Sequence, residues 1–485
     1  MLKLIIPFLI ILNGITMSQD NNFIHSLSES HSLFCEKKIN DRRFKHKDIV
    51  PLIKSLKNNK DFIVKKAGES VNKRDIYLIS WGTGPKKIFM WSQMHGDEST
   101  ATMALFDIFN FLKDNEHFKE FKDELKTKVT LYFMPMVNPD GAEVFKRRNY
   151  FDIDINRDAI RQQTPEGLTL RKTFDSLKAD FGFNLHDQVI YHTTGINYKS
   201  AALSFLAPAP DYEKTITPLR ERAMRLIAKL FTELSTIIPG HIGKYNDDHE
   251  TRAFGDNFQK WGTSTILIET GGWKDDPEKQ FLRKLNFIAL ISSFKGIMEE
   301  SYNKFEVSVY NSIPFNEEYL KDVILKNVTY ELKGKKYLVD VAILREEKSS
   351  KDSNNYYYKS SVDDIGDLSV FSGYEEYDLT GMTLEKGQTY NKRFHHEADV
   401  LKQDIRKLYK KGFTNVIVKH LSEENFTKIP FNIVESKYKV DETLNLNESA
   451  DFIIKQNDKV KYVMVNGFLY DVDNNLGEIK NGMVR

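Results

Sequence analysis

The sequence has almost no cysteine, because Cys35 is the only one among 485 residues. A single thiol excludes an internal disulfide, so the fold depends on its hydrophobic core. The sequence also lacks an excess of charge of one sign: Lys and Arg total 70, Asp and Glu total 69, and the net charge is +1. No global electrostatic field favours polyanions, and we expect no nucleic-acid partner.

Long apolar runs are absent beyond the N-terminus. Residues 1–18 contain Lys3, an apolar stretch over residues 4–12 and small residues near position 18. This order predicts a secretory signal peptide over residues 1–18, and the apolar stretch is too short for a comfortable membrane span. An uncleaved anchor is the alternative. We therefore expect a secreted or periplasmic protein with no stable membrane span after cleavage.

The length predicts two or three domains. Strand patterns at residues 74–80, 87–91 and 129–136 alternate with helical patterns at residues 101–112 and 218–238. This alternation predicts an α/β domain over residues 40–300, with a mixed sheet and helices on both faces.

Other segments carry weaker patterns. Residues 19–40 are polar and expected to be loosely ordered, and residues 48–57 predict a helix with Asp48 as N-cap. Beyond residue 300, hairpin patterns such as the one around Asn466-Gly467 predict a mainly β accessory domain over residues 301–485. A single helix is expected over residues 398–411.

Two metal-binding side chains, His95 and Glu98, are three positions apart in the sequence. Residues three apart on a first helical turn, or on the loop entering it, point the same way. An imidazole nitrogen and a carboxylate oxygen can then reach one metal ion at about 2.0–2.2 Å. The pair follows a predicted strand and precedes a predicted helix, which is where open α/β sheets place their ligands.

A catalytic zinc site usually has three protein ligands and a water. His186, which ends an apolar run, is the third candidate, whereas His192 is expected in a loop on the substrate side. Glu269 ends the apolar run that begins at Thr265 and precedes a Gly-Gly pair. A carboxylate buried at a strand end is costly without a polar partner. A metal-bound water would be such a partner, so Glu269 is the candidate base that activates water.

The set of motifs resembles the zinc carboxypeptidase family, the carboxypeptidase A-like metallopeptidases. The family pattern is HxxE, then an early Arg with a closing DxNR, then a lone His and a Glu at strand ends. The resemblance covers about residues 40–300, and the matching residues occur in the same order: His95, Glu98, Arg147, Asp154, Asn156, Arg157, His186 and Glu269.

The resemblance implies one Zn²⁺ per chain, bound by His95, Glu98 and His186. It implies that Glu269 is the general base and later the proton donor. Asp154 would orient His95, since metal-bound histidines usually donate their second nitrogen to a carboxylate or carbonyl.

The resemblance also implies how substrate is held. Arg147 would stabilise the oxyanion, and the family spacing favours it over Arg148. Asn156 and Arg157 would hold the free C-terminal carboxylate of a peptide substrate.

The residues that contact the substrate's last side chain are less defined. Tyr245 is the tyrosine nearest to the position of the family's mobile tyrosine, and Arg252 is its rival for substrate contact. The side-chain pocket is expected between residues 247 and 261, where Asp256 would favour a basic residue.

The sequence therefore predicts a secreted zinc carboxypeptidase. One alternative is a zinc amidohydrolase acting on small N-acyl amino acids or cell-wall peptides, because both substrates carry the carboxylate that Asn156 and Arg157 would bind. Another is a non-catalytic binding protein on the same scaffold.

Overall fold

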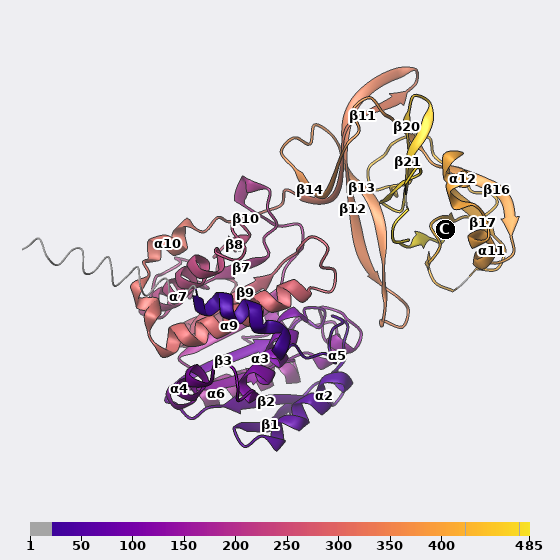
Figure 1. The fold of residues 1–485 in the computed structure, drawn as a ribbon. Helices are drawn as coiled ribbons and strands as arrows, with labels where there is room; N and C mark the ends of the chain where they lie inside the picture. The colour runs from indigo at the N-terminus through magenta and orange to yellow at the C-terminus, as the bar shows by residue number, and fades with distance from the viewer. Residues whose placement is uncertain (1–21, 422, 475) are drawn as a thin grey trace, which may run out of the picture. The chain divides into compact units, whose positions relative to one another are not determined.

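The computed structural model describes residues 22–421, 423–474 and 476–485, so the predicted signal peptide lies outside the described residues. The chain forms two compact units that divide between Glu318 and Tyr319 (Figure 1). Residues 301–318, which the sequence assigned to the second domain, belong to the first unit. They do so because helix α10 (Val307–Ser312) packs on α7 and strand β10 (Asn316–Glu317) pairs with β6.

The first unit begins with helical residues 22–34. Its further helices are α2 (His46–Ser55), α3 (Thr100–Lys113), α4 (Lys119–Lys128), α5 (Pro139–Glu143), α6 (Pro165–Leu177), α7 (Pro218–Leu234), α8 (Phe254–Lys260), α9 (Gln280–Met298) and α10. Its 3₁₀ turns are η1 (Leu56–Asn58), η2 (Ile155–Arg157), η3 (Gly195–Asn197) and η4 (Ser301–Lys304). Its remaining strands are β1 (Phe62–Glu69), β2 (Asp75–Trp81), β3 (Lys86–Ser92), β4 (Val129–Met134), β5 (Phe181–Asp187), β6 (Thr193–Thr194), β7 (Leu203–Leu206), β8 (Ile242–Lys244) and β9 (Ser264–Thr270).

Eight of these strands form one mixed sheet in the order β1-β2-β4-β3-β5-β9-β7-β8. The central strands β4, β3, β5 and β9 run parallel, whereas β2 and β7 are antiparallel to their partners in the centre. Parallel central strands end at one edge of the sheet, so side chains at their carboxyl ends are neighbours.

Helices cover both faces of this sheet, as alternation along β3 illustrates. Ile88 and Met90 belong to the core that also contains buried residues of α3, α7 and α9. Phe89 and Trp91 point to the opposite face, into the core formed with α6 and α8. Successive residues of a strand face opposite sides of the sheet. A strand that is apolar throughout therefore needs helices on both faces to bury it. The predicted fold class is confirmed.

The second unit is mainly β, as predicted. Its strands are β11 (Leu320–Leu332), β12 (Lys335–Ser349), β13 (Tyr356–Gly366), β14 (Ser372–Asp378), β15 (Thr383–Lys386), β16 (Gln388–Phe394), β17 (Phe413–Val418), β18 (Phe426–Thr427), β19 (Asn432–Ile433), β20 (Phe452–Gln456), β21 (Lys459–Val465), β22 (Phe468–Asp471) and β23 (Gly482–Met483). The expected hairpin joins β21 to β22, and both turn residues, Asn466 and Gly467, have positive φ, as a type I′ turn requires.

Three local predictions were wrong. Residues 22–34 are helical and bury Ile24 and Leu27, so this segment is part of the core. The N-cap of α2 is Lys45, while Asp48 occupies the third helical position and accepts a bond from the Lys45 backbone N–H at 2.8 Å. The single helix expected over residues 398–411 is two short helices, α11 (Glu397–Leu401) and α12 (Ile405–Lys410).

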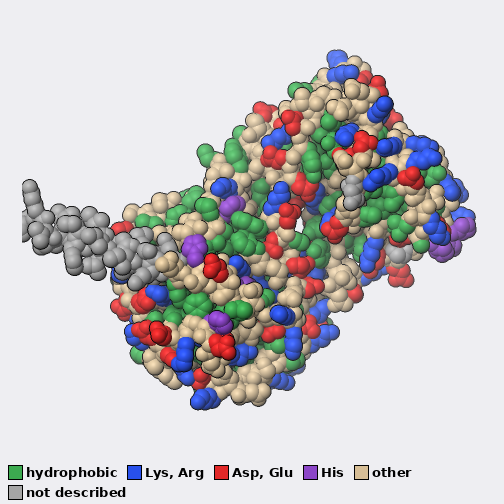
Figure 2. Space-filling model, viewed as in Figure 1, with side chains coloured by type: hydrophobic (Ala, Val, Ile, Leu, Met, Phe, Trp, Pro, Cys, Tyr) green, Lys and Arg blue, Asp and Glu red, His purple; other side chains and the backbone are tan. Residues whose placement is uncertain are grey.

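Basic and acidic side chains are interspersed on the face drawn in Figure 2, in keeping with the balanced composition. Among the residues that the structure describes, no helix is long and apolar enough to cross a membrane.

Candidate active site

The loop that leaves β3 carries His95 and Glu98. Gln93 turns the chain with a positive φ of 53°, and its side-chain amide donates to the Gly96 carbonyl at 2.9 Å. Gly96 is required because a Cβ there would lie 2.1 Å from the Gly141 backbone. The Glu98 backbone N–H donates to the His95 carbonyl at 3.2 Å, which places the two side chains together before α3 begins.

His95, Glu98 and His186 form a buried group whose ligand atoms all lie within 4.8 Å of one another. Nδ1 of His95 is 2.7 Å from Oε1 of Glu98, and Nδ1 of His186 is 2.6 Å from Oε2. The two Nδ1 atoms are 3.2 Å apart. A tetrahedral zinc ion with ligands at about 2.0–2.1 Å spaces them about 3.3 Å apart, so two imidazoles and a carboxylate in this arrangement fit zinc.

Asp154 fixes the orientation of His95. Its Oδ1 accepts from His95 Nε2 at 3.1 Å and from the Asn156 backbone N–H at 2.9 Å. Burial opposes its ionisation, but the hydrogen bond from His95 and the charges of His95 and Arg147 hold the pKa of Asp154 well below its usual range. With Nε2 engaged, Nδ1 is the nitrogen that faces Glu98 and His186.

Glu269 lies on β9 directly opposite His186 on β5. Among the described residues, no hydrogen bond or ion pair reaches its carboxylate. Burial and the negative charge of Glu98 raise the pKa of Glu269 well above its usual value. A carboxylate with this environment suits a group that must accept and release a proton.

Arg147 reaches the group of metal-binding residues, and Arg148 does not. Nη1 of Arg147 is 3.2 Å from Oε1 of Glu98, and its Nη2 donates to Oδ2 of Asp154 at 3.0 Å. The backbone also ties Arg147 to the loop, because its carbonyl accepts from the Gly96 N–H at 3.3 Å. Arg148 instead donates to the Asp152 carbonyl at 2.9 Å.

Asn156 and Arg157 lie on η2, immediately after Asp154. Nδ2 of Asn156 is 3.5 Å from Nε2 of His186, and its Oδ1 accepts from the Phe254 backbone N–H at 3.0 Å. Nε of Arg157 lies 3.3 Å from Oε2 of Glu250, and its Nη1 donates to the Asn156 carbonyl at 2.9 Å. The structure therefore brings Asn156 next to His186, and Arg157 follows it along η2 and contacts Glu250.

Tyr245 directly follows β8. Burial, and to a smaller extent the negative charges of Glu269 and Glu98, raise the pKa of its hydroxyl. Its ring packs edge-on against His192, with centroids 5.8 Å apart. Nδ1 of His192 is 3.2 Å from Oε1 of Gln188, so this histidine lies outside the metal-binding group.

In the segment 249–256, Arg252 and Asp256 both contact Glu250. Arg252 pairs with Glu250 through Nε and Nη2, each at 3.2 Å. Asp256 is half-buried, accepts from the Glu250 backbone N–H at 3.1 Å, and lies 3.5 Å from Nδ1 of His249. The carboxylate expected to select a basic substrate residue therefore supports its own loop.

The sequence interpretation missed two residues of this region. Glu250 pairs with arginines on two different segments. Its position two residues before Arg252 is the one feature of the sequence that could have indicated this pairing. Asn184 lies two residues before His186 on β5 and is buried, and its Oδ1 has no partner among the described atoms. No pattern in the sequence distinguishes it.

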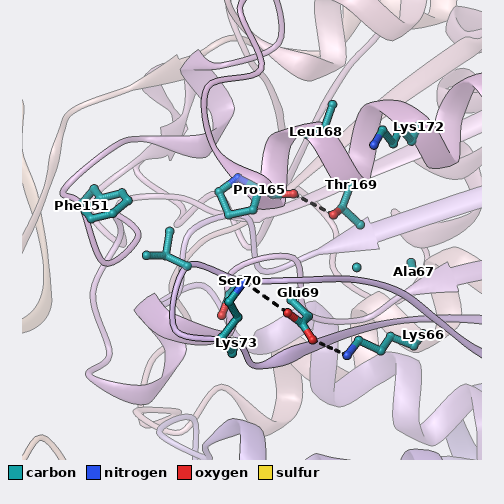
Figure 3. Close-up of a pocket in the computed structure, with 12 residues that line it drawn as sticks. Lys66, Ala67, Glu69, Ser70, Lys73, Phe151, Pro165, Leu168, Thr169 and Lys172 are labelled. Carbon is teal, nitrogen blue, oxygen red and sulfur yellow. Dashed lines mark hydrogen bonds and ion pairs between the residues drawn. The ribbon is translucent and has the colours of Figure 1, made fainter.

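A pocket of about 430 Å³ lies elsewhere, between β1 and the start of α6 (Figure 3). Lys66, Lys73 and Lys172 contribute to its lining, and Lys66 pairs with Glu69. None of the residues predicted for the active site lines it, so it is a separate surface feature.

A mixed α/β sheet with a His–Glu–His group where parallel strands end defines a zinc-metalloenzyme domain. Residues 49–227 match the family model described as zinc carboxypeptidase. The predicted cofactor, one Zn²⁺ per chain, agrees with the family description and with the metal-binding group.

Relatives carry similar names. Carboxypeptidase SOL1 of Arabidopsis thaliana is 32% identical over 113 residues, which cover 22% of this chain and 23% of that protein. Carboxypeptidase M of Mus musculus is 26% identical over 172 residues, covering 30% and 39%. A solved metallo-carboxypeptidase from Burkholderia cenocepacia aligns with 16% identity and a TM-score of 0.44, covering 53% of this chain and 70% of that one. The alignments span less than half the length of these two curated relatives.

Proposed function

We propose that this chain is a secreted zinc carboxypeptidase that hydrolyses the last peptide bond of substrates with a free C-terminal carboxylate. The observation that carries the proposal is the placement of Glu269 opposite His186, beside a group that fits zinc. His95, Glu98 and His186 would hold the ion, which supplies Lewis acidity and lowers the pKa of bound water when present.

Each remaining residue has a separable role in this proposal. Glu269 accepts the proton of the attacking water and delivers it to the leaving amine. Arg147 donates a hydrogen bond to the oxygen that becomes negative, and its link to Asp154 keeps it in place. Asn156 and Arg157 bind the terminal carboxylate, which restricts cleavage to the chain end.

The test is cleavage of a matched pair of peptides by the zinc-loaded protein. One peptide has a free C-terminus and the other is amidated, and released residues are identified by mass spectrometry. Stepwise release from the free acid alone supports a carboxypeptidase. Cleavage of small N-acyl amino acids but not of peptides would favour an amidohydrolase, and retention of zinc with no hydrolysis would favour a binding protein.

Secretion is part of the proposal and rests on residues 1–18. Expression of the full-length chain should release a protein whose N-terminus, determined by sequencing, lies close to residue 19. An intact Met1 on the membrane-bound protein would contradict it.

A further inference from the structure

Glu250 lies between the two arginines expected to contact substrate. Oε2 of Glu250 is 3.3 Å from Nε of Arg157 and accepts from Nη2 of Arg252 at 3.2 Å. Oε1 accepts from Nε of Arg252, also at 3.2 Å. One carboxylate therefore bridges two guanidinium groups from distant parts of the sequence.

The bridge uses only some of the available donors. Arg157 directs Nε to Glu250 and Nη1 to the Asn156 carbonyl, and Arg252 uses Nε and Nη2. Among the described residues, Nη2 of Arg157 and Nη1 of Arg252 have no protein partner. Nη2 of Arg157 can therefore donate a charge-assisted hydrogen bond to a ligand carboxylate.

The charges of this trio leave room for one further anion. Two guanidinium groups and one carboxylate sum to +1, which a single substrate carboxylate neutralises. Without the carboxylate of Glu250, the two guanidinium groups would repel each other, because like charges a few ångströms apart are only partly screened near a protein surface. The hydrogen bonds from Arg252 also keep the pKa of Glu250 below its usual value, so the carboxylate is ionised.

The backbone around Glu250 is supported on both sides. Its N–H donates to Asp256, and its carbonyl accepts from the Ala253 N–H at 3.0 Å. The Arg252 carbonyl accepts from the Ala159 N–H at 3.1 Å, which ties this loop to the segment just after Arg157. Glu250 is therefore fixed relative to Arg157.

We propose that Glu250 is a positioning residue that holds Arg157 and Arg252 as a pair able to bind one terminal carboxylate. This inference rests on the proposed function. Glu250 does not touch substrate in this arrangement; it sets where Nη2 of Arg157 lies. The opposite possibility, an internal carboxylate that competes with substrate, predicts tighter binding when Glu250 is removed.

The test measures binding without turnover. Zinc-loaded protein carrying Glu269→Gln is titrated with a fluorescent pentapeptide that ends in a free carboxylate, and with its amidated twin. Adding Glu250→Gln should weaken binding of the free acid on the order of tenfold and leave the amidated peptide unchanged, because a charge-assisted contact is lost. Replacing the exposed Arg161 by Met is the matched control and should change neither affinity.

Two results would overturn the proposal. Unchanged or tighter binding of the free acid by Glu250→Gln excludes a positioning role, and equal weakening of both peptides excludes an effect directed at the terminal carboxylate. If Glu250→Gln does not fold, Glu250→Asp is the second variant, because it keeps the charge on a side chain one methylene shorter. It should lower the affinity for the free-acid peptide alone, by less than the loss expected for Glu250→Gln. The wild-type protein could hydrolyse no peptide and still bind the free acid selectively through Glu250. That result would refute the proposed function and support this inference.

Discussion

His186 and Glu269 are paired in register on the neighbouring parallel strands β5 and β9. Parallel pairing directs both side chains to the same side of the sheet, so a metal ligand and a candidate base are placed by backbone hydrogen bonds alone. Because the pair lies where both strands end, it depends on the sheet and not on a mobile loop.

Glu269→Gln should abolish most activity without loss of metal. Glutamine keeps the size of the side chain but cannot accept the proton, and general-base catalysis contributes about 10²–10⁴-fold. The expected result is a fall of that order in kcat with normal zinc content, measured by steady-state kinetics and atomic absorption. Turnover close to wild type would contradict the assignment.

His186→Ala should lose zinc, and His192→Ala should retain it. His186 contributes a nitrogen to the buried metal-binding group, whereas His192 contacts Gln188 outside it. Bound zinc after extensive dialysis distinguishes the two variants. Loss of metal in His192→Ala alone would mean that the wrong histidine was chosen.

Arg157→Lys should narrow the preference for free-acid over amidated peptides. Lysine keeps the charge but cannot form two parallel hydrogen bonds to a carboxylate. We expect kcat/KM for the free acid to fall by about 10–100-fold, the range for losing a charge-assisted contact, with little change for the amide. A variant that discriminates as well as the wild type would exclude Arg157 from this role.

Asp107→Asn should destabilise the first unit by about 3–5 kcal/mol, because it leaves a buried arginine without its counter-ion. Oδ1 of Asp107 is 2.5 Å from Nη2 of Arg283, Oδ2 is 2.9 Å from Nε2 of His31, and both Asp107 and Arg283 are fully buried. Urea unfolding measures the change. Asp123→Asn removes an exposed pair with Lys119 and should cost less than about 1 kcal/mol.

Acid should weaken the second unit through Asp451. Burial opposes its ionisation, but the charge of Arg485 and hydrogen bonds from Asn466 and Asn432 lower its pKa in the folded protein. A lowered folded pKa gives stability that is present above the unfolded value of about 3.9 and is lost as pH falls below it. Asp451→Asn should therefore lower the unfolding midpoint more at pH 6 than at pH 2.5, measured by thermal denaturation.

Much of the site follows from local sequence, and the rest depends on long-range contacts. The spacing of His95 and Glu98 and the strand ends at His186 and Glu269 are visible in apolar patterns, because strands and turns are encoded locally. The bridge from Glu250 to Arg157 joins two loops, whose relative position is set by the sheet and not by either segment. The helix over residues 22–34 was not predicted because its few apolar residues are stabilised by burial against the rest of the core, and the local sequence does not show this contact.

The ion pair between Asp107 and Arg283 affects the choice of boundaries for a recombinant fragment of the first unit. Nη1 of Arg283 also donates to the Ile39 carbonyl, its Nη2 donates to the Glu36 carbonyl, and the Glu36 N–H donates to Asp107. A recombinant fragment of residues 40–300 would remove these contacts together with α10 and β10. Limited proteolysis should therefore yield a resistant core that includes residues 36–39 and extends to about residue 318.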